Sequence, residues 1–210
     1  MPRADAERNR KALVAAARQV YERDGYVAPR ITDIAEAAGV AHGSFYSHFP
    51  GKEDVFAAVL ADVEEEMLHP VPLMGPLMGP APASAEPDPE PDPVAAIAAA
   101  NLAYLTAYQR NARLMALLEQ VAAVDEKFRA IRLRRTEAFL ARNARAIRRL
   151  QQAGLADPAL DPDLAALALS TMVSRSAYAA FAVGATRPVD AGELAATLTR
   201  LWVSGLRLPG

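Results

Sequence analysis

Residues 31–56 constrain the fold more than any other part of the chain, and they read ITDIAEAAGVAHGSFYSHFPGKEDVF. Two short helical patterns meet at Gly39, where glycine adopts the positive φ of a tight turn at little cost. Ala35 is small enough for two helices to approach closely. The second pattern carries hydroxyl, histidine and tyrosine side chains but no acid. This layout predicts a helix-turn-helix, whose second helix is shaped to enter the DNA major groove.

The alternative for this segment is an ordinary helical hairpin in the core of a bundle. A core hairpin has no reason to expose two serines, a tyrosine and a histidine together on a helix of barely two turns. The DNA-binding interpretation is therefore preferred.

Composition favours an all-α protein, because 52% of the 210 residues are hydrophobic and only 6% are aromatic. The chain has no cysteine, which excludes disulfides, thiolate metal sites and a cysteine nucleophile. No uncharged apolar run approaches the roughly 20 residues of a membrane span. The start, MPRADAERNRK, lacks an apolar signal core, so we expect a cytoplasmic protein with no membrane partner.

Charge is distributed unevenly, although the net charge is only -2. Residues 1–52 hold 8 basic and 6 acidic side chains, whereas residues 53–92 hold 10 acids and no Lys or Arg. Residues 93–210 hold 15 basic and 9 acidic side chains, and residues 39–52 hold no acid. A local neutral or basic face can dock on phosphate even when the whole chain is slightly acidic.

Four helices are expected in the N-terminal part. The first runs over 6–24, with one apolar face formed by Leu13, Ala16, Ala17 and Val20. The second begins at Thr32 or one residue earlier, with Asp33 at the positive end of its dipole. Pro50 and Gly51 end the third, and Lys52 opens the fourth.

Proline divides the chain, because nine of its 16 prolines lie in residues 70–93. Proline blocks helix, so this segment is expected to be an extended or disordered connector. Helices are then expected near 93–109, 111–124, 125–153, 161–184 and 190–207, with Asp161, Asp163 and Asp190 as N-terminal caps. The predicted domains are a DNA-binding domain over 1–52, a connecting helix over 53–69, a flexible linker over 70–92 and a helical bundle over 93–210.

The helix-turn-helix segment resembles the DNA-binding signature of the TetR/AcrR family of bacterial transcriptional regulators. The matching elements are Thr32, Ile34, Ala35, Ala38–Val40, Gly43–Tyr46, His48–Phe49 and Lys52–Glu53. The resemblance implies a homodimeric repressor on a palindromic operator, whose C-terminal bundle binds a small molecule and releases the DNA. Ala41 departs from the family, which usually has a capping Ser or Thr before its third helix.

Eight residues are predicted to contact DNA. Tyr46, Lys52 and Thr32 are the candidates for phosphate contacts. His42, Gly43, Ser44 and Ser47 are expected near base edges, and His48 either joins them or packs against the fourth helix. Tyr46 has packing between helices as its alternative role. Arg3, Arg8, Arg10 and Lys11 form either an arm on the DNA or a solvated helix start.

The last two expected helices are predicted to form the dimer. The 161–184 segment is apolar almost all round, so it must be covered on every side. Arg175 within it, and Glu119 in LMALLEQVAAV, stand alone in apolar surroundings. Such buried charges need partners, so we expect them to pair with each other or to bracket a polar group of a ligand.

A mostly apolar ligand pocket is predicted in the bundle, next to a stripe over 133–150 that includes Thr136. The candidate lining residues are Tyr104, Tyr108, Met115, Phe139, Asn143, Met172, Arg175 and Tyr178. Plain bundle core is the alternative for each of them. The arginines over 129–149 are expected to form mostly a solvated face, with an anionic ligand nearby as a second option.

Other functions are less well supported by the sequence. The bundle has no Glu-x-x-His metal motif, and the chain has no Gly-x-Ser-x-Gly elbow or phosphate loop, so no catalytic residue, metal or cofactor is expected. A helical-bundle enzyme is the least favoured class. A DNA-binding regulator controlled by a protein partner, without a small ligand, is the second interpretation.

Overall fold

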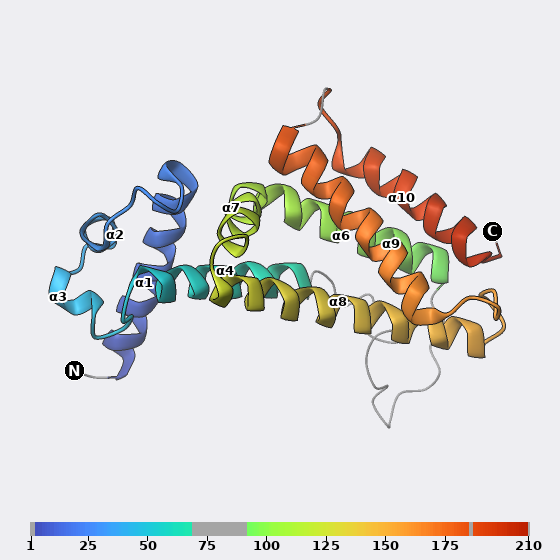
Figure 1. The fold of residues 1–210 in the computed structure, drawn as a ribbon, viewed down its shortest axis with the longest axis horizontal. Helices are drawn as coiled ribbons and strands as arrows, with labels where there is room; N and C mark the ends of the chain where they lie inside the picture. The colour runs from blue at the N-terminus through green and yellow to red at the C-terminus, as the bar shows by residue number, and fades with distance from the viewer. Residues whose placement is uncertain (1–2, 69–91, 185–186, 210) are drawn as a thin grey trace. The chain divides into compact units, whose positions relative to one another are not determined.

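The computed structural model describes residues 3–68, 92–184 and 187–209, and within these ranges it contains helices and no strand (Figure 1). The predicted all-α fold is confirmed. The helices of the N-terminal part are α1 (Arg3–Asp24), α2 (Ile31–Ala37), α3 (His42–Phe45) and α4 (Lys52–Leu68). Those that follow are α6 (Pro93–Arg110), α7 (Ala112–Ala122), α8 (Glu126–Gln152), α9 (Pro162–Ala177), the π-helical η2 (Tyr178–Gly184) and α10 (Ala191–Leu206). The proline-rich connector lies outside the described residues, apart from Asp92.

The chain forms two compact units whose limits differ from the domains expected at 1–52 and 93–210. Unit one comprises Met1–Glu65 and Arg113–Arg132, and unit two comprises Glu66–Ala112 and Leu133–Gly210. Helix α7 and the start of α8 therefore pack with the N-terminal helices. Sequence periodicity identifies the buried face of a helix but not the helices that cover it, which is why this grouping was not expected.

An aromatic cluster explains why the start of α8 belongs to unit one. Phe128 is fully buried, with its ring centroid 5.3 Å from that of Phe56 and 5.7 Å from that of Tyr26. Tyr21 meets Phe56 edge to face at 4.8 Å, and its hydroxyl donates to the Lys52 carbonyl at 3.0 Å. Burial, with smaller contributions from Glu53 and Asp125, raises the pKa of Tyr26 to about 12. The cluster joins α1, α4 and α8 in one core.

Unit two is built around α6, α9 and α10, which contact one another (Figure 1). Two buried polar pairs link its helices. Asn101 of α6 donates its Nδ2 to the hydroxyl of Thr199 of α10 at 3.1 Å, and Asn143 of α8 donates to Ser170 of α9 at 2.8 Å. Each pair satisfies an amide donor that would be costly to bury alone.

Aspartates begin three helices of unit two. The carboxylate of Asp161 accepts the backbone N–H groups of Asp163 and Leu164, and that of Asp190 caps α10 in the same way. These two predicted caps are confirmed. Asp92 caps α6. Asp163 lies within the first turn of α9 and pairs with Arg148 instead of capping a helix.

Glu119 and Arg175 were expected to be buried and to pair with each other or bracket a ligand group, but neither is buried and each contacts a different residue. Glu119 lies in α7 and its carboxylate is 3.2 Å from the guanidinium of Arg132 in α8. Arg175 is exposed, with its guanidinium carbon 4.9 Å from the centroid of the Tyr178 ring. The apolar neighbours of Arg175 in sequence do not enclose it because they occupy other faces of the same helix.

Replacing Phe128 with alanine should lower the free energy of unfolding by about 3–5 kcal/mol, because it leaves a cavity in the aromatic cluster. Chemical denaturation measures the loss. Leu133→Ala is the control, because Leu133 is 49% exposed one and a half turns later in α8 and should change stability by less than about 0.5 kcal/mol. Equal effects of the two substitutions would contradict this packing.

Candidate functional site

Helix α2 has well-defined ends, which position the turn that follows it. At its start, the Asp33 carboxylate accepts the backbone N–H of Arg30 at 2.8 Å, and this bond lowers the pKa of Asp33. At its end, Gly39 has φ +66°, its N–H donates to Glu36, and the N–H of Val40 donates to the carbonyl of Ala35 at 3.0 Å. These two bonds form a Schellman motif, which ends the helix and turns the chain toward α3.

Helix α3 is a single turn whose capping position is occupied by Ala41. Ala41 has φ -64° and ψ 141°, the extended backbone of an N-cap, but its side chain can accept no hydrogen bond. Backbone bonds continue past the helix, from the N–H groups of His48 and Phe49 to the carbonyl of Phe45. Phe45 is fully buried and Phe49 is 4% exposed, so these rings hold the segment against the rest of unit one.

The predicted DNA-contacting residues of this segment divide into an exposed group and a half-buried group. His42, Gly43, Tyr46 and Ser47 are exposed, and Ser44 and His48 are half-buried. The Tyr46 side chain is 52% exposed, and its ring meets those of His42 and Phe45 edge to face at 5.4 and 5.6 Å. Packing fixes the ring of Tyr46 while more than half of its surface stays accessible.

Lys52 and Thr32 are already engaged within the protein. The Lys52 ammonium donates to the carbonyls of Tyr26 and Val27, both at 3.2 Å, and lies 5.0 Å from the Tyr26 ring centroid. Lys52 therefore closes the loop after α1, and its ammonium group has one further proton to donate. Thr32 is exposed at the start of α2, with its hydroxyl 3.4 Å from the Asp33 carboxylate.

The basic residues of α1 are arranged in different ways. Arg8 pairs with Asp5 at 2.9 Å, as in a solvated helix start. Arg10 is exposed, and its guanidinium carbon lies 5.3 Å from the centroid of the Phe49 ring, next to the α3 segment. Lys11 is exposed, and the side chain of Arg3 lies outside the described residues. Arg10 therefore lies beside Phe49, in the segment that follows α3.

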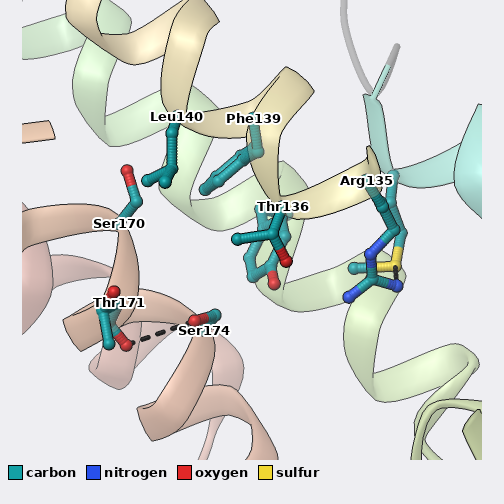
Figure 2. A pocket seen from close by; sticks show the side chains of 9 residues that line it. Arg135, Thr136, Phe139, Leu140, Ser170, Thr171 and Ser174 are labelled. Carbon is teal, nitrogen blue, oxygen red and sulfur yellow. Dashed lines mark hydrogen bonds between the residues drawn. The ribbon is translucent and has the colours of Figure 1, made fainter. Parts of the chain in front are cut away.

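Unit two contains two neighbouring hollows that share Tyr104 and Phe139, whose rings stack at 5.2 Å. In the first hollow, side chains of α8 face the hydroxyl groups of Ser170 and Ser174 on α9 (Figure 2). Each hollow has a volume of about 50 Å³.

The predicted ligand residues are not all found at one place. Tyr104 and Phe139 line both hollows, and Asn143 lines the second. Arg175 and Tyr178 line a separate, more open hollow beside η2. The remaining three candidates line none of these hollows: Tyr108, Met115 and Met172.

Several lining residues were not predicted. Arg142 and Trp202 line the second hollow, and Arg135 lines the first, where it donates to the sulfur of Met67. The arginines were expected to be solvated because α8 carries many of them, and the sequence alone does not distinguish the inward-facing ones. The polar residues Asn101 and Ser170, which stand within apolar helices, were the available signal.

These features define an all-α protein with an N-terminal helix-turn-helix and a C-terminal helical unit that contains hollows. Residues 13–59 match the family model described as "Bacterial regulatory proteins, tetR family". This match covers the helix-turn-helix segment, and it confirms that the segment resembles the tetR family. The matched model describes regulatory proteins, in agreement with the expectation that the chain is not an enzyme.

Curated relatives match over the N-terminal region. The HTH-type transcriptional repressor BepR of Brucella suis is 37% identical over 81 residues, which cover 34% of this chain and 39% of that protein. The HTH-type transcriptional regulator SrpR of Pseudomonas putida is 39% identical over 70 residues, which cover 33% of this chain and 31% of that protein. The matched segments thus span less than half of these relatives.

Solved structures match over almost the whole chain. NalD of Pseudomonas aeruginosa, described as the secondary repressor of the MexAB-OprM multidrug efflux pump, has a TM-score of 0.72 and 22% identity, covering 97% of this chain and 98% of NalD. The fatty acid degradation regulator FadR of Bacillus halodurans has a TM-score of 0.71 and 20% identity, covering 96% and 97%. At such identities these likenesses establish the fold.

Ala41→Ser should raise the free energy of unfolding of unit one by about 1 kcal/mol, because a serine hydroxyl can accept a backbone N–H at the start of α3. Chemical denaturation followed by circular dichroism measures the change. Ala15→Ser, on the exposed face of α1, is the matched control and should be neutral or slightly destabilising. An equal gain at both positions would contradict a missing cap.

Proposed function

We propose that the chain is a transcriptional repressor that binds a double-stranded DNA operator through α3. The observation that carries the proposal is the accessible, acid-free surface at residues 41–47, held in place by the buried ring of Phe45. A helix presented in this way can enter a major groove without repulsion from phosphate. A cytoplasmic location follows from the same function.

The residues at this surface have separate roles in the proposal. Tyr46 donates its hydroxyl to a phosphate, and its packed ring limits the freedom lost on binding. His42, Ser44 and Ser47 approach base edges, while Gly43 allows close approach of the backbone. Lys52 and Thr32 contact phosphate beside them. His48, which is half-buried, lies at the margin of this surface.

Tyr46→Phe should weaken binding to all DNA sequences by about 1.5–3 kcal/mol, because it removes one hydrogen bond to a charged phosphate. Lys52→Ala should also weaken all sequences and reduce the slope of log K against log salt by about one. Titration of labelled DNA at several salt concentrations measures both effects.

Arg145→Ala, an exposed substitution in unit two, is the control and should leave the salt slope unchanged. Because Lys52 also holds the loop at Tyr26 and Val27, the unfolding of Lys52→Ala is measured in parallel. Loss of discrimination at a single base pair, without a general loss of affinity, would contradict the phosphate assignments.

A homodimer through α9 and α10 completes the proposal. Leu164 and Leu167 on α9 and Leu201 on α10 are 66%, 48% and 48% exposed. Residues Pro162–Gly184 are long and apolar enough to cross a membrane by length and composition alone, and 22% of their most apolar window is buried. Asp163 and Arg175 place charges in this segment, and charges are costly inside a membrane. In the proposal, a second copy of the chain therefore covers this surface instead of a membrane.

The double substitution Leu167→Glu and Leu201→Glu should convert the dimer to a monomer and weaken binding to a two-half-site DNA fragment by about tenfold or more. Analytical ultracentrifugation and DNA titration measure the two effects. Leu102→Glu on α6 is the matched control, because Leu102 is 45% exposed. A protein that stays dimeric with both glutamates would refute this interface.

Control by a small molecule in the hollows of unit two is the final part of the proposal. It is supported by the mostly apolar lining of the hollows and by the stacked rings of Tyr104 and Phe139, which line both of them. Regulation by a protein partner remains the alternative. Release of a bound DNA fragment by small molecules, set against release by a purified partner protein, separates the two.

A further inference from the structure

The second hollow combines an apolar wall with a small number of nitrogen donors. Aliphatic side chains from α6, α8, α9 and α10 form most of the wall, including Ile97, Ile147 and Val173. Among the described residues that line either hollow, none is an Asp or Glu. The wall can therefore bury the hydrocarbon part of a ligand, and the donors decide which polar group that ligand carries.

Trp202 provides the first donor. The side chain lines the hollow from α10 and the residue is only 7% exposed. Its indole Nε1 is buried and makes no hydrogen bond to any described residue. A buried N–H without an acceptor is unfavourable, and an indole can only donate, so a ligand acceptor would satisfy it.

Arg142 provides the second donor and the positive charge. It lines the hollow from α8, with its guanidinium carbon 5.0 Å from the centroid of the Phe139 ring. Burial lowers the pKa of the Arg142 guanidinium, and the neighbouring charge of Arg145 lowers it further. The guanidinium is thus a poorly solvated cation at the wall of the hollow, and its five N–H donors allow it to bind more than one acceptor.

The two amides that line the hollow each use one of their N–H donors within the protein. Asn101 donates to Thr199, and Asn143 donates to Ser170. These bonds fix both amides against neighbouring helices. Both amides are neutral, so the charge preference of the hollow is set by Arg142, and Trp202 adds a neutral group that only donates.

We propose that the second hollow binds an organic monoanion, a carboxylate on an aliphatic or alicyclic body, with the carboxylate at Arg142 and the Trp202 indole N–H. This rests on the proposed control of the repressor by a small molecule and specifies the chemical class of that molecule. A carboxylate only accepts hydrogen bonds, so it complements both groups. An ammonium would be repelled by Arg142.

The chain contains one tryptophan, so its fluorescence reports directly on this hollow. The probes are octanoate, octan-1-ol and octylammonium, together with the acid, alcohol and amine of a 4-cyclohexylbutyl skeleton. Each acid should change the emission saturably and bind about tenfold or more tightly than its alcohol, and the amines should bind most weakly.

Arg142→Gln should lower the affinity for both acids by about tenfold or more and leave the alcohols unchanged. Arg134→Gln, at an exposed position of the same helix, should leave the affinity for the acids unchanged. Circular dichroism checks the fold of each variant. Trp202→Phe keeps a ring but removes the N–H, and calorimetry should record weaker acid binding, which gives a second test if Arg142→Gln does not fold.

The anion site is overturned if alcohols bind as tightly as acids, if Arg142→Gln binds the acids normally, or if no acid binds. DNA selected from random sequence with the purified protein separates this result from the proposed function. Protein that binds DNA but no acid refutes the anion site alone. Protein that binds acids but no DNA refutes the repressor.

Discussion

Burial of Phe45 is the interaction on which the proposed DNA-binding surface at residues 41–47 depends. A single helical turn has little stability of its own in water, because nucleation is unfavourable and few bonds offset it. Ala41 adds no side-chain cap, so α3 is held by tertiary packing. The buried rings of Phe45 and Phe49 supply that packing, and the Schellman bonds at Gly39 set the direction from which the chain arrives.

The same reasoning explains which parts of the fold were predictable from sequence. Apolar spacing identified the buried faces of α1 and α4, where Leu13, Val20, Phe56 and Val63 are all buried. Gly39 was recognisable because its positive φ restricts the residue type. Helix caps followed from Asp161 and Asp190. Each of these features is determined by residues close together in the sequence, and so each can be predicted from one sequence.

Features that depend on distant residues were less predictable. Nothing near Phe128 in sequence indicates that it packs against Tyr26 and Phe56, and so the start of α8 was assigned to the wrong group of helices. Likewise, Tyr104, Phe139 and Asn143 were predicted to line a pocket and do line the second hollow, but Arg142, which also lines it, was grouped with a mostly solvated face. Helical spacing cannot show which arginine of many is enclosed by a second helix.

Lys52 illustrates how folding can prepare a binding group. A free lysine loses about 2 kcal/mol of side-chain entropy when it is immobilised on a ligand. Here the ammonium already contacts the carbonyls of Tyr26 and Val27 before any DNA arrives. Most of that ordering therefore occurs when unit one folds. A phosphate that accepts the remaining N–H would bind a cation that is already held in position. Little further side-chain entropy would then be lost when the phosphate binds.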